Sequence, residues 1–98
     1  MKTITRTSFA SDPFVSAPCD IAQAIKAART QANLRIVDAA LLSGVALQTF
    51  VDIEAGSPGV SIGRILQVAN AMGVSLLAIP AINRERVRQQ IAMAANAK

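Results

Sequence analysis

The stretch IVDAALLSGVALQTFVDIE, residues 36–54, decides the fold of this chain. Apolar residues recur at helical spacing on both sides of Gly44. Glycine commonly ends a helix because it adopts positive φ at little cost. The pattern therefore predicts two short helices, over 36–43 and 47–54, joined by a turn at 44–46.

The apolar residues of these two helices predict which faces pack inward. Val37, Ala40 and Leu41 are expected to face the core from the first helix, and Phe50 and Ile53 from the second. The chain has only three Phe and no Trp or Tyr. Its core is therefore expected to consist of aliphatic side chains and Ala, which suit packed helices.

Further helices are predicted on either side of this stretch. Asp20 is a suitable N-cap for a helix over 21–32, and Asn33 suits the C-terminal turn of that helix. Ser61 is a suitable N-cap for a fourth helix, whose apolar residues recur at i, i+3, i+4 and i+7. Gly73 is expected to end this fourth helix.

The last element of the predicted bundle is a short helical turn over 76–79, which Pro80 ends. The expected fold is therefore all-α, a five-helix bundle within a domain spanning 19–80. Residues 1–18 are rich in Ser, Thr and Pro and lack periodicity, which predicts a flexible N-terminal arm. Residues 81–98 form a basic C-terminal tail.

The tail can form one more helix over 84–95, with Asn83 as its cap. The apolar stripe of this helix consists of Val87, Ile91 and Ala94. Such a thin stripe buries little apolar surface, which favours a frayed or partner-dependent helix.

Composition and charge exclude several classes of protein. Cys19 is the single cysteine and there is no histidine, so neither an internal disulfide nor a Cys/His zinc site can form. The chain lacks both the run of about 18 apolar residues that spans a membrane and the pattern of a signal peptide. These features predict a cytoplasmic protein.

The net charge is +4, of which 81–98 carries +3, whereas acidic and basic residues balance over 20–80.

Catalysis is not expected from this sequence. Cys19 has no recognisable general base, and the carboxylates are few and scattered. The glycine-containing segment 56–63 lacks the lysine and the spacing of a phosphate-binding loop. We therefore expect neither an enzyme nor a bound metal or cofactor.

Two short helices joined by a glycine-containing turn, inside a compact helical domain, define a helix-turn-helix. The stretch 25–76 resembles the Xre (lambda-repressor-like) helix-turn-helix family. The residues that carry this resemblance are Ile25, Arg29, Asn33-Leu34, Ala40, Gly44-Val45, Phe50, Ile53-Glu54, Gly56, Ala69, Met72-Gly73-Val74 and Leu76. A finer resemblance, carried by 56–68, is to HipB-type antitoxins.

The resemblance implies a lambda-repressor-like bundle in a homodimer that binds double-stranded DNA at an operator and represses transcription. The finer resemblance implies a protein partner such as a kinase-like toxin. The resemblance to the Xre family further implies that Arg29 pairs with Glu54, mainly as a structural contact that joins two helices.

The resemblance also implies which residues contact DNA. The helix over 47–54 is expected to be the recognition helix, and its N-terminal end is expected to enter the major groove. Gln48 and Thr49 are the good hydrogen-bonding residues among the expected base readers. The complete expected set, including three basic residues for phosphates, is Lys26, Arg35, Ala46, Leu47, Gln48, Thr49, Asp52 and Arg64.

The expected DNA-binding face departs from the family pattern, because Ile36, Leu47 and Val51 are apolar. A cluster of exposed apolar residues suggests a protein interface. A slight rotation of the helix that buries these side chains would also explain them. The alternative function is therefore a protein-binding module, an anti-activator or a toxin-neutralising partner, that barely touches DNA.

Overall fold

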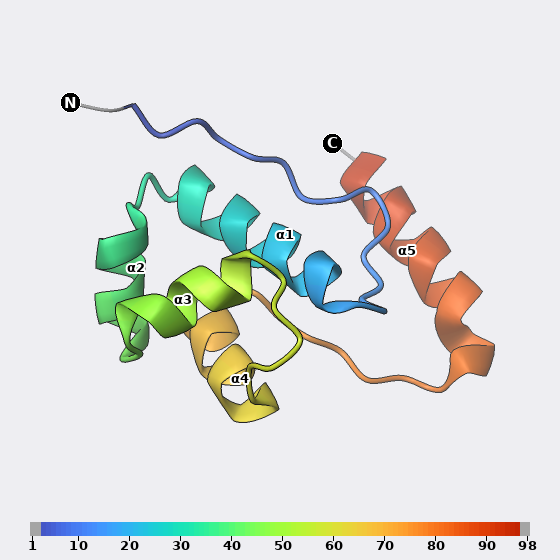
Figure 1. Cartoon of the computed structure of the whole chain (residues 1–98). Helices are drawn as coiled ribbons and strands as arrows, with labels where there is room; N and C mark the ends of the chain where they lie inside the picture. The colour runs from blue at the N-terminus through green and yellow to red at the C-terminus, as the bar shows by residue number, and fades with distance from the viewer. Residues whose placement is uncertain (1–2, 97–98) are drawn as a thin grey trace.

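The computed structural model describes residues 3–96 and, within them, consists of helices and connecting segments without β-strands (Figure 1). The helices are α1 Pro18–Gln31, α2 Ile36–Ser43, α3 Leu47–Glu54, α4 Ile62–Ala71, the 3-10 helix η1 Ala81–Asn83 and α5 Arg84–Asn96. The predicted all-α class is confirmed. The predictions for the arm and the tail extend to residues 1–2 and 97–98, which lie outside the described residues.

The start of α1 differs from the prediction, because Asp20 is not its N-cap. The helix begins at Pro18, a residue that suits the first helical position because its missing N–H needs no partner there. Asp20 lies in the first turn, where its Oδ2 accepts hydrogen bonds from the backbone N–H groups of Ser16, at 3.0 Å, and Ala17, at 3.1 Å. A carboxylate at this end also interacts favourably with the helix dipole.

The ends of α1 and α4 follow from local residues. Asn33 adopts the left-handed conformation, with φ of 59°. The chain then reverses, and the N–H of Leu34 donates to the carbonyl of Arg29 at 3.1 Å. Ser61 caps α4, since its Oγ accepts from the N–H of Arg64 at 3.3 Å.

The core lies where α1, α2, α3 and α4 meet. Its buried side chains are Ile25 from α1, Ala39 and Ala40 from α2, Phe50 and Ile53 from α3, and Val68 from α4. Phe50, Ile25 and Val68 are the largest fully buried side chains of this group. Only small side chains of α2 are fully buried, so this helix packs closely against its neighbours.

The predicted inward face of α2 is wrong for two of its three residues. Val37 is 48% exposed and Leu41 is 82% exposed, while Ala40 is buried as expected. The inward face carries Ile36, Ala39, Ala40 and Ser43 at positions i, i+3, i+4 and i+7. Because α2 carries apolar residues on several faces, hydrophobicity alone cannot indicate which of them packs inward.

The helical turn predicted over 76–79 is also wrong, because residues 74–80 have no regular secondary structure. Proline disfavours the helical conformation in the residue before it, and a single turn is too short to offset the cost of nucleating a helix. The fifth α-helix of the described chain is therefore α5, which follows the 3-10 helix directly.

Residues 3–17 run antiparallel to α1 along its surface (Figure 1). The N–H of Thr7 donates to Thr30 Oγ1 at 2.9 Å, and Gln31 Nε2 donates to the carbonyl of Thr7 at 2.9 Å. These bonds join the segment to the C-terminal half of α1.

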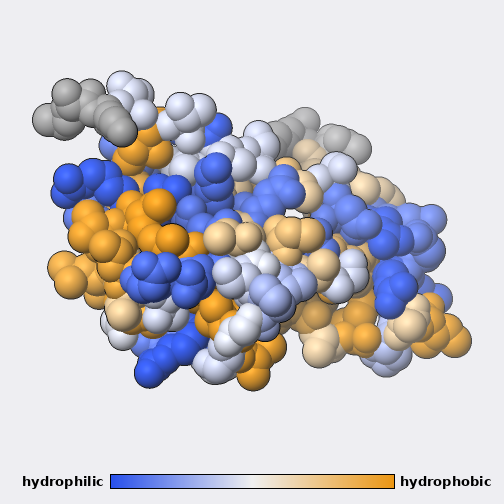
Figure 2. Space-filling view, in the orientation of Figure 1, coloured by the Kyte–Doolittle hydropathy of each residue, from blue (hydrophilic) through white to orange (hydrophobic). Residues whose placement is uncertain are grey.

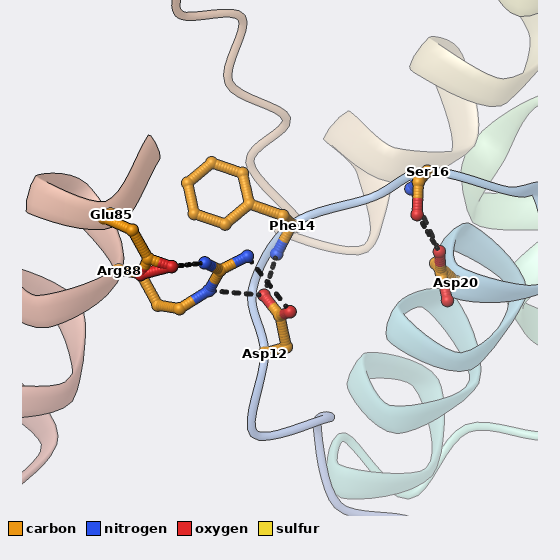
Figure 3. A network of polar contacts seen from close by, with 6 residues as sticks. All are labelled: Asp12, Phe14, Ser16, Asp20, Glu85 and Arg88. Atoms are coloured by element: carbon orange, nitrogen blue, oxygen red, sulfur yellow. Dashed lines mark hydrogen bonds and ion pairs between the residues drawn. The ribbon is translucent and has the colours of Figure 1, made fainter. Parts of the chain in front are cut away.

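The same segment contacts α5 further along (Figure 3). Arg88 lies 3.2 Å from Asp12 Oδ2 through its Nη2, and its guanidinium lies 5.0 Å from the centroid of the Phe14 ring. Arg88 also pairs with Glu85 one turn before it on α5. Asp12 Oδ1 accepts from the N–H of Phe14 at 3.0 Å. One arginine therefore joins α5 to the N-terminal segment through a charged and an aromatic contact.

Candidate nucleic-acid interface

The two helices α2 and α3 meet at an angle of 111° across the turn 44–46. Helix-turn-helix motifs have angles of about 90–120°. Gly44 ends α2 in the left-handed conformation, with φ of 72°. The N–H of Val45 donates to the carbonyl of Ala40 at 3.2 Å.

In the described residues, no single helix is long and apolar enough to cross a membrane.

The helix α3 packs against α1 and α2 through one face, on which Phe50 and Ile53 are buried. Its other residues lie toward the outside. Ala46, Leu47 and Gln48 are exposed, Val51 is 37% exposed, and Thr49 and Asp52 are half-buried. All the residues of this segment that were predicted to contact bases therefore retain some accessible surface.

On the outer face, Gln48 is bonded to Asp52. Gln48 Nε2 donates to Asp52 Oδ1 at 2.9 Å, one helical turn away. A glutamine reads adenine through both its amide nitrogen and its amide oxygen. To read a base in this way, Gln48 must release the carboxylate of Asp52 or share its amide protons with it.

Arg29 and Glu54 join α1 to the end of α3. Arg29 Nε lies 2.6 Å from Glu54 Oε2, Arg29 Nη2 lies 3.0 Å from Glu54 Oε1, and both side chains are 8% exposed. Arg29 Nη1 also donates to the carbonyl of Leu34 at 2.8 Å. One buried guanidinium thus connects α1, the segment between α1 and α2, and α3.

Arg35 directly precedes α2, and its charge is offset by a neighbouring carboxylate. Its Nε lies 2.9 Å from Asp38 Oδ2, and the pair is exposed to solvent. The hydrogen bond to Arg35 lowers the pKa of Asp38, and the same bond raises the pKa of Arg35. A phosphate approaching Arg35 therefore competes with Asp38.

Lys26 is exposed on α1 and borders an open hollow of about 570 Å³ that it shares with Arg35. The N-terminal segment closes one side of this hollow. The lining residues are Thr3, Ile4, Thr5, Lys26, Arg29, Thr30 and Arg35. Two predicted phosphate contacts therefore lie at one hollow.

Arg64 lies in the first turn of α4, where its partner is a neutral side chain. Its Nη1 donates to Gln67 Oε1 at 3.1 Å. Gln67 Nε2 in turn donates to the carbonyl of Ser43 at 2.8 Å. Gln67 was not predicted as a site residue, because a glutamine within a helix carries no local signal of such a contact.

The three apolar residues predicted as a protein interface do not share one environment. Ile36 is half-buried and packs against the core, whereas Leu47 and Val51 remain exposed. The exposed apolar side chains of α2 are Val37 and Leu41, which were predicted to face the core, and Leu42, for which no prediction was made. Figure 2 shows apolar surface over α2, on the left of the molecule.

Three comparisons with known proteins bear on this arrangement. The family model described as "Helix-turn-helix" (HTH_3) matches residues 25–79. The "Uncharacterized HTH-type transcriptional regulator y4mF" of Sinorhizobium fredii (strain NBRC 101917 / NGR234) is 39% identical over 62 residues, which cover 63% of this chain and 82% of that protein. A solved structure described as "MDT Protein" superposes with a TM-score of 0.62 at 18% identity, over 69% of this chain and 96% of that one. This last similarity concerns the fold alone.

Proposed function

This chain belongs to the helix-turn-helix family, and from that membership we propose that it binds DNA and regulates transcription. The matched segment 25–79 includes both helices of the motif and the turn between them. A regulator of this kind needs a surface that recognises DNA and requires no catalytic group.

The observation that carries the proposal is the outward presentation of α3. Phe50 and Ile53 anchor one face of α3 in the core, and the Arg29–Glu54 pair holds its end to α1. The opposite face, with Gln48 and Thr49 near its N-terminal end, stays accessible. Recognition helices read base edges with their N-terminal residues in the same way.

We further propose that the chain acts as a homodimeric repressor. A helix-turn-helix dimer reads two half-sites about 34 Å apart, one turn of the double helix. Such a dimer excludes other proteins from the DNA that it covers. The resemblance of 56–68 to HipB-type antitoxins supports a second role for the same dimer, as the antitoxin that holds a kinase-like toxin.

A mobility-shift titration against the DNA that flanks the chain's own gene tests DNA binding. We expect Gln48→Ala to raise the Kd for the operator on the order of tenfold, since a good side-chain contact to a base contributes about 1–3 kcal/mol of discrimination. Gln89→Ala, which truncates an exposed glutamine of α5, is the matched control and should leave the Kd unchanged. Absence of any shift at low salt would contradict the proposal.

One observation favours a second candidate function, the binding of a protein through α2. Val37, Leu41 and Leu42 expose large aliphatic side chains on one short helix. Leu47 and Val51 add exposed apolar surface on the adjacent helix α3. Contiguous apolar surface of this kind commonly marks a site of protein interaction. The two functions are compatible, because an antitoxin binds both DNA and its toxin.

A further inference from the structure

Gln67 on α4 contacts two parts of the candidate interface at once. Its Nε2 donates to the carbonyl of Ser43 at 2.8 Å and to the carbonyl of Gly44 at 3.2 Å. Its Oε1 accepts from Arg64 Nη1 at 3.1 Å. One half-buried side chain thus links the turn of the helix-turn-helix to a predicted phosphate contact.

The turn needs the donor that Gln67 supplies. The last carbonyls of a helix have no intrahelical N–H to bond, so another group has to satisfy them. At the end of α2, the carbonyls of Ser43 and Gly44 are satisfied by the amide of Gln67. A Cβ added at Gly44 would lie 3.2 Å from Gln67 Nε2, so the side-chain amide approaches the turn closely.

The turn also determines which way the amide of Gln67 points. Backbone carbonyls accept hydrogen bonds and cannot donate them, so the NH₂ group must face Ser43 and Gly44. The amide oxygen then points away from the turn, where it accepts from the guanidinium of Arg64. The position of the turn is thereby coupled to the position of the Arg64 guanidinium.

The neutrality of Gln67 distinguishes Arg64 from Arg35. Asp38 offsets the charge of Arg35 across a distance of 2.9 Å. The amide of Gln67 holds the guanidinium of Arg64 without offsetting its charge. A side chain that is already oriented loses less conformational entropy when it binds, so a held and uncompensated arginine suits a DNA phosphate.

We propose that Gln67 is a positioning residue of the DNA interface, which couples the turn between α2 and α3 to Arg64 and orients Arg64 for a backbone phosphate. The proposal rests on the proposed function, since it concerns how the same surface meets DNA. It assigns no base contact to Gln67 itself.

A double-mutant cycle tests the coupling, with the Kd for the operator measured over a series of KCl concentrations. The variants are Gln67→Met, which keeps the size of the side chain but removes all three of its hydrogen bonds, Arg64→Ala, and the double variant. We expect Gln67→Met to raise the Kd about fivefold in the wild-type background and less than about twofold in the Arg64→Ala background. Equal effects in the two backgrounds would overturn the proposal, because Gln67 would then act through the fold alone.

The salt dependence of the Kd distinguishes a positioning role from a merely structural one. A residue that acts only through the fold does not change the number of phosphate contacts, so it leaves this dependence unchanged. Removing one phosphate contact lowers the slope of log Kd against log salt by about 0.9. Arg64→Ala should therefore lower the slope by about this amount, and Gln67→Met should lower it in the same direction. A slope unchanged by Gln67→Met, with a raised Kd, counts against the proposal.

Gln67→Lys serves if Gln67→Met does not fold, since its ammonium can still donate to the carbonyls of Ser43 and Gly44 but offers Arg64 no acceptor. Asn70→Lys, which adds the same charge at an exposed position of α4 one turn away, is the matched control. We expect a lower slope for Gln67→Lys than for Asn70→Lys, and equal slopes would overturn the proposal. If the wild-type chain binds no DNA, the proposed function fails together with this inference; if it binds and the cycle shows no coupling, this inference alone fails.

Discussion

Arg29 and Glu54 form a buried ion pair that joins α1 to the end of α3. Their side chains are both 8% exposed, and they bond each other at 2.6 and 3.0 Å. Taking two charges out of water is costly, so such a pair contributes little over a matched apolar pair. Removal of one partner is different, because it leaves the other charge buried without compensation.

We expect Glu54→Gln to destabilise the chain by about 3–5 kcal/mol, as is typical when a buried pair is broken. The double variant Arg29→Met/Glu54→Leu should recover most of this loss, because it leaves no charge buried. Urea unfolding followed by circular dichroism measures both. Asp38→Asn, which breaks the exposed pair with Arg35, is the control and should hardly change the midpoint. Equal midpoints for Glu54→Gln and wild type would show that the pair does not hold α3.

The helix α5 is an element whose position depends on few contacts. An isolated helix of its length is marginally stable in water. Arg88 attaches α5 to the N-terminal segment through Asp12 and the ring of Phe14 (Figure 3). The N-terminal segment is in turn bonded to α1 through Thr7. The segment that the sequence suggests as a flexible arm therefore connects α1 to α5 in the structure.

This attachment is expected to depend on the charge of Asp12. The hydrogen bond from the N–H of Phe14 lowers the pKa of Asp12 below its usual 3.8, and Arg88 lowers it further. A carboxyl whose pKa is lowered in the folded state stabilises the fold at any pH above its usual pKa. This stabilisation is lost as the pH falls from the usual pKa through the lowered pKa. The attachment should therefore persist at neutral pH and weaken only below about pH 3.8.

Asp12→Asn should detach α5 already at neutral pH. We expect faster amide hydrogen exchange over α5 and unchanged exchange in the core residues of α1, measured by NMR. Asp38→Asn removes another arginine-paired carboxylate, on α2, and should leave α5 unaffected. Protection of α5 in Asp12→Asn equal to that in the wild type would mean that other contacts hold it.

Across the whole molecule, the basic residues are not concentrated on the helix-turn-helix, whereas DNA-binding domains usually carry a basic patch there. Residues 20–80 have balanced charge, and the excess of basic residues lies in 81–98. Apolar side chains are exposed on α2 beside α3, the proposed recognition helix (Figure 2). Binding to DNA through such a surface depends on few phosphate contacts, which implies a shallow salt dependence. The same surface is the one proposed above to bind a protein partner.

The variant Leu41→Lys separates the two uses of the surface. We expect it to abolish co-purification of a protein partner from the native host and to leave operator binding within about threefold, because it removes apolar contact area rather than a base reader. Leu77→Lys, at a residue 70% exposed in the segment after α4, is the matched control and should retain the partner. Co-purification that survives Leu41→Lys, or the capture of no protein at all, would count against binding through α2.

Much of the local structure could be predicted because it depends on neighbouring residues. The bounds of α2 and α3 were predicted to the residue, since Gly44 and the turn signals are local. The start of α1 was misplaced because Pro18 and Asp20 both suit a first turn, in different positions. The turn over 76–79 failed because a single apolar turn before proline has no intrinsic stability.

The sequence by itself determined that the chain is helical, that a turn at 44–46 separates α2 from α3, and that Phe50 and Ile53 point inward, because spacing and glycine placement act over one or two turns. Only the tertiary structure decided which face of α2 is buried. The face with Ala39 and Ala40 is buried instead of the face with Val37 and Leu41, because two small side chains permit closer packing of α2. The tertiary structure also decided the contacts of Gln67, whose partners Ser43 and Gly44 lie more than twenty residues away along the chain. Contacts at that separation exist only once the helices have packed, so no local pattern reports them.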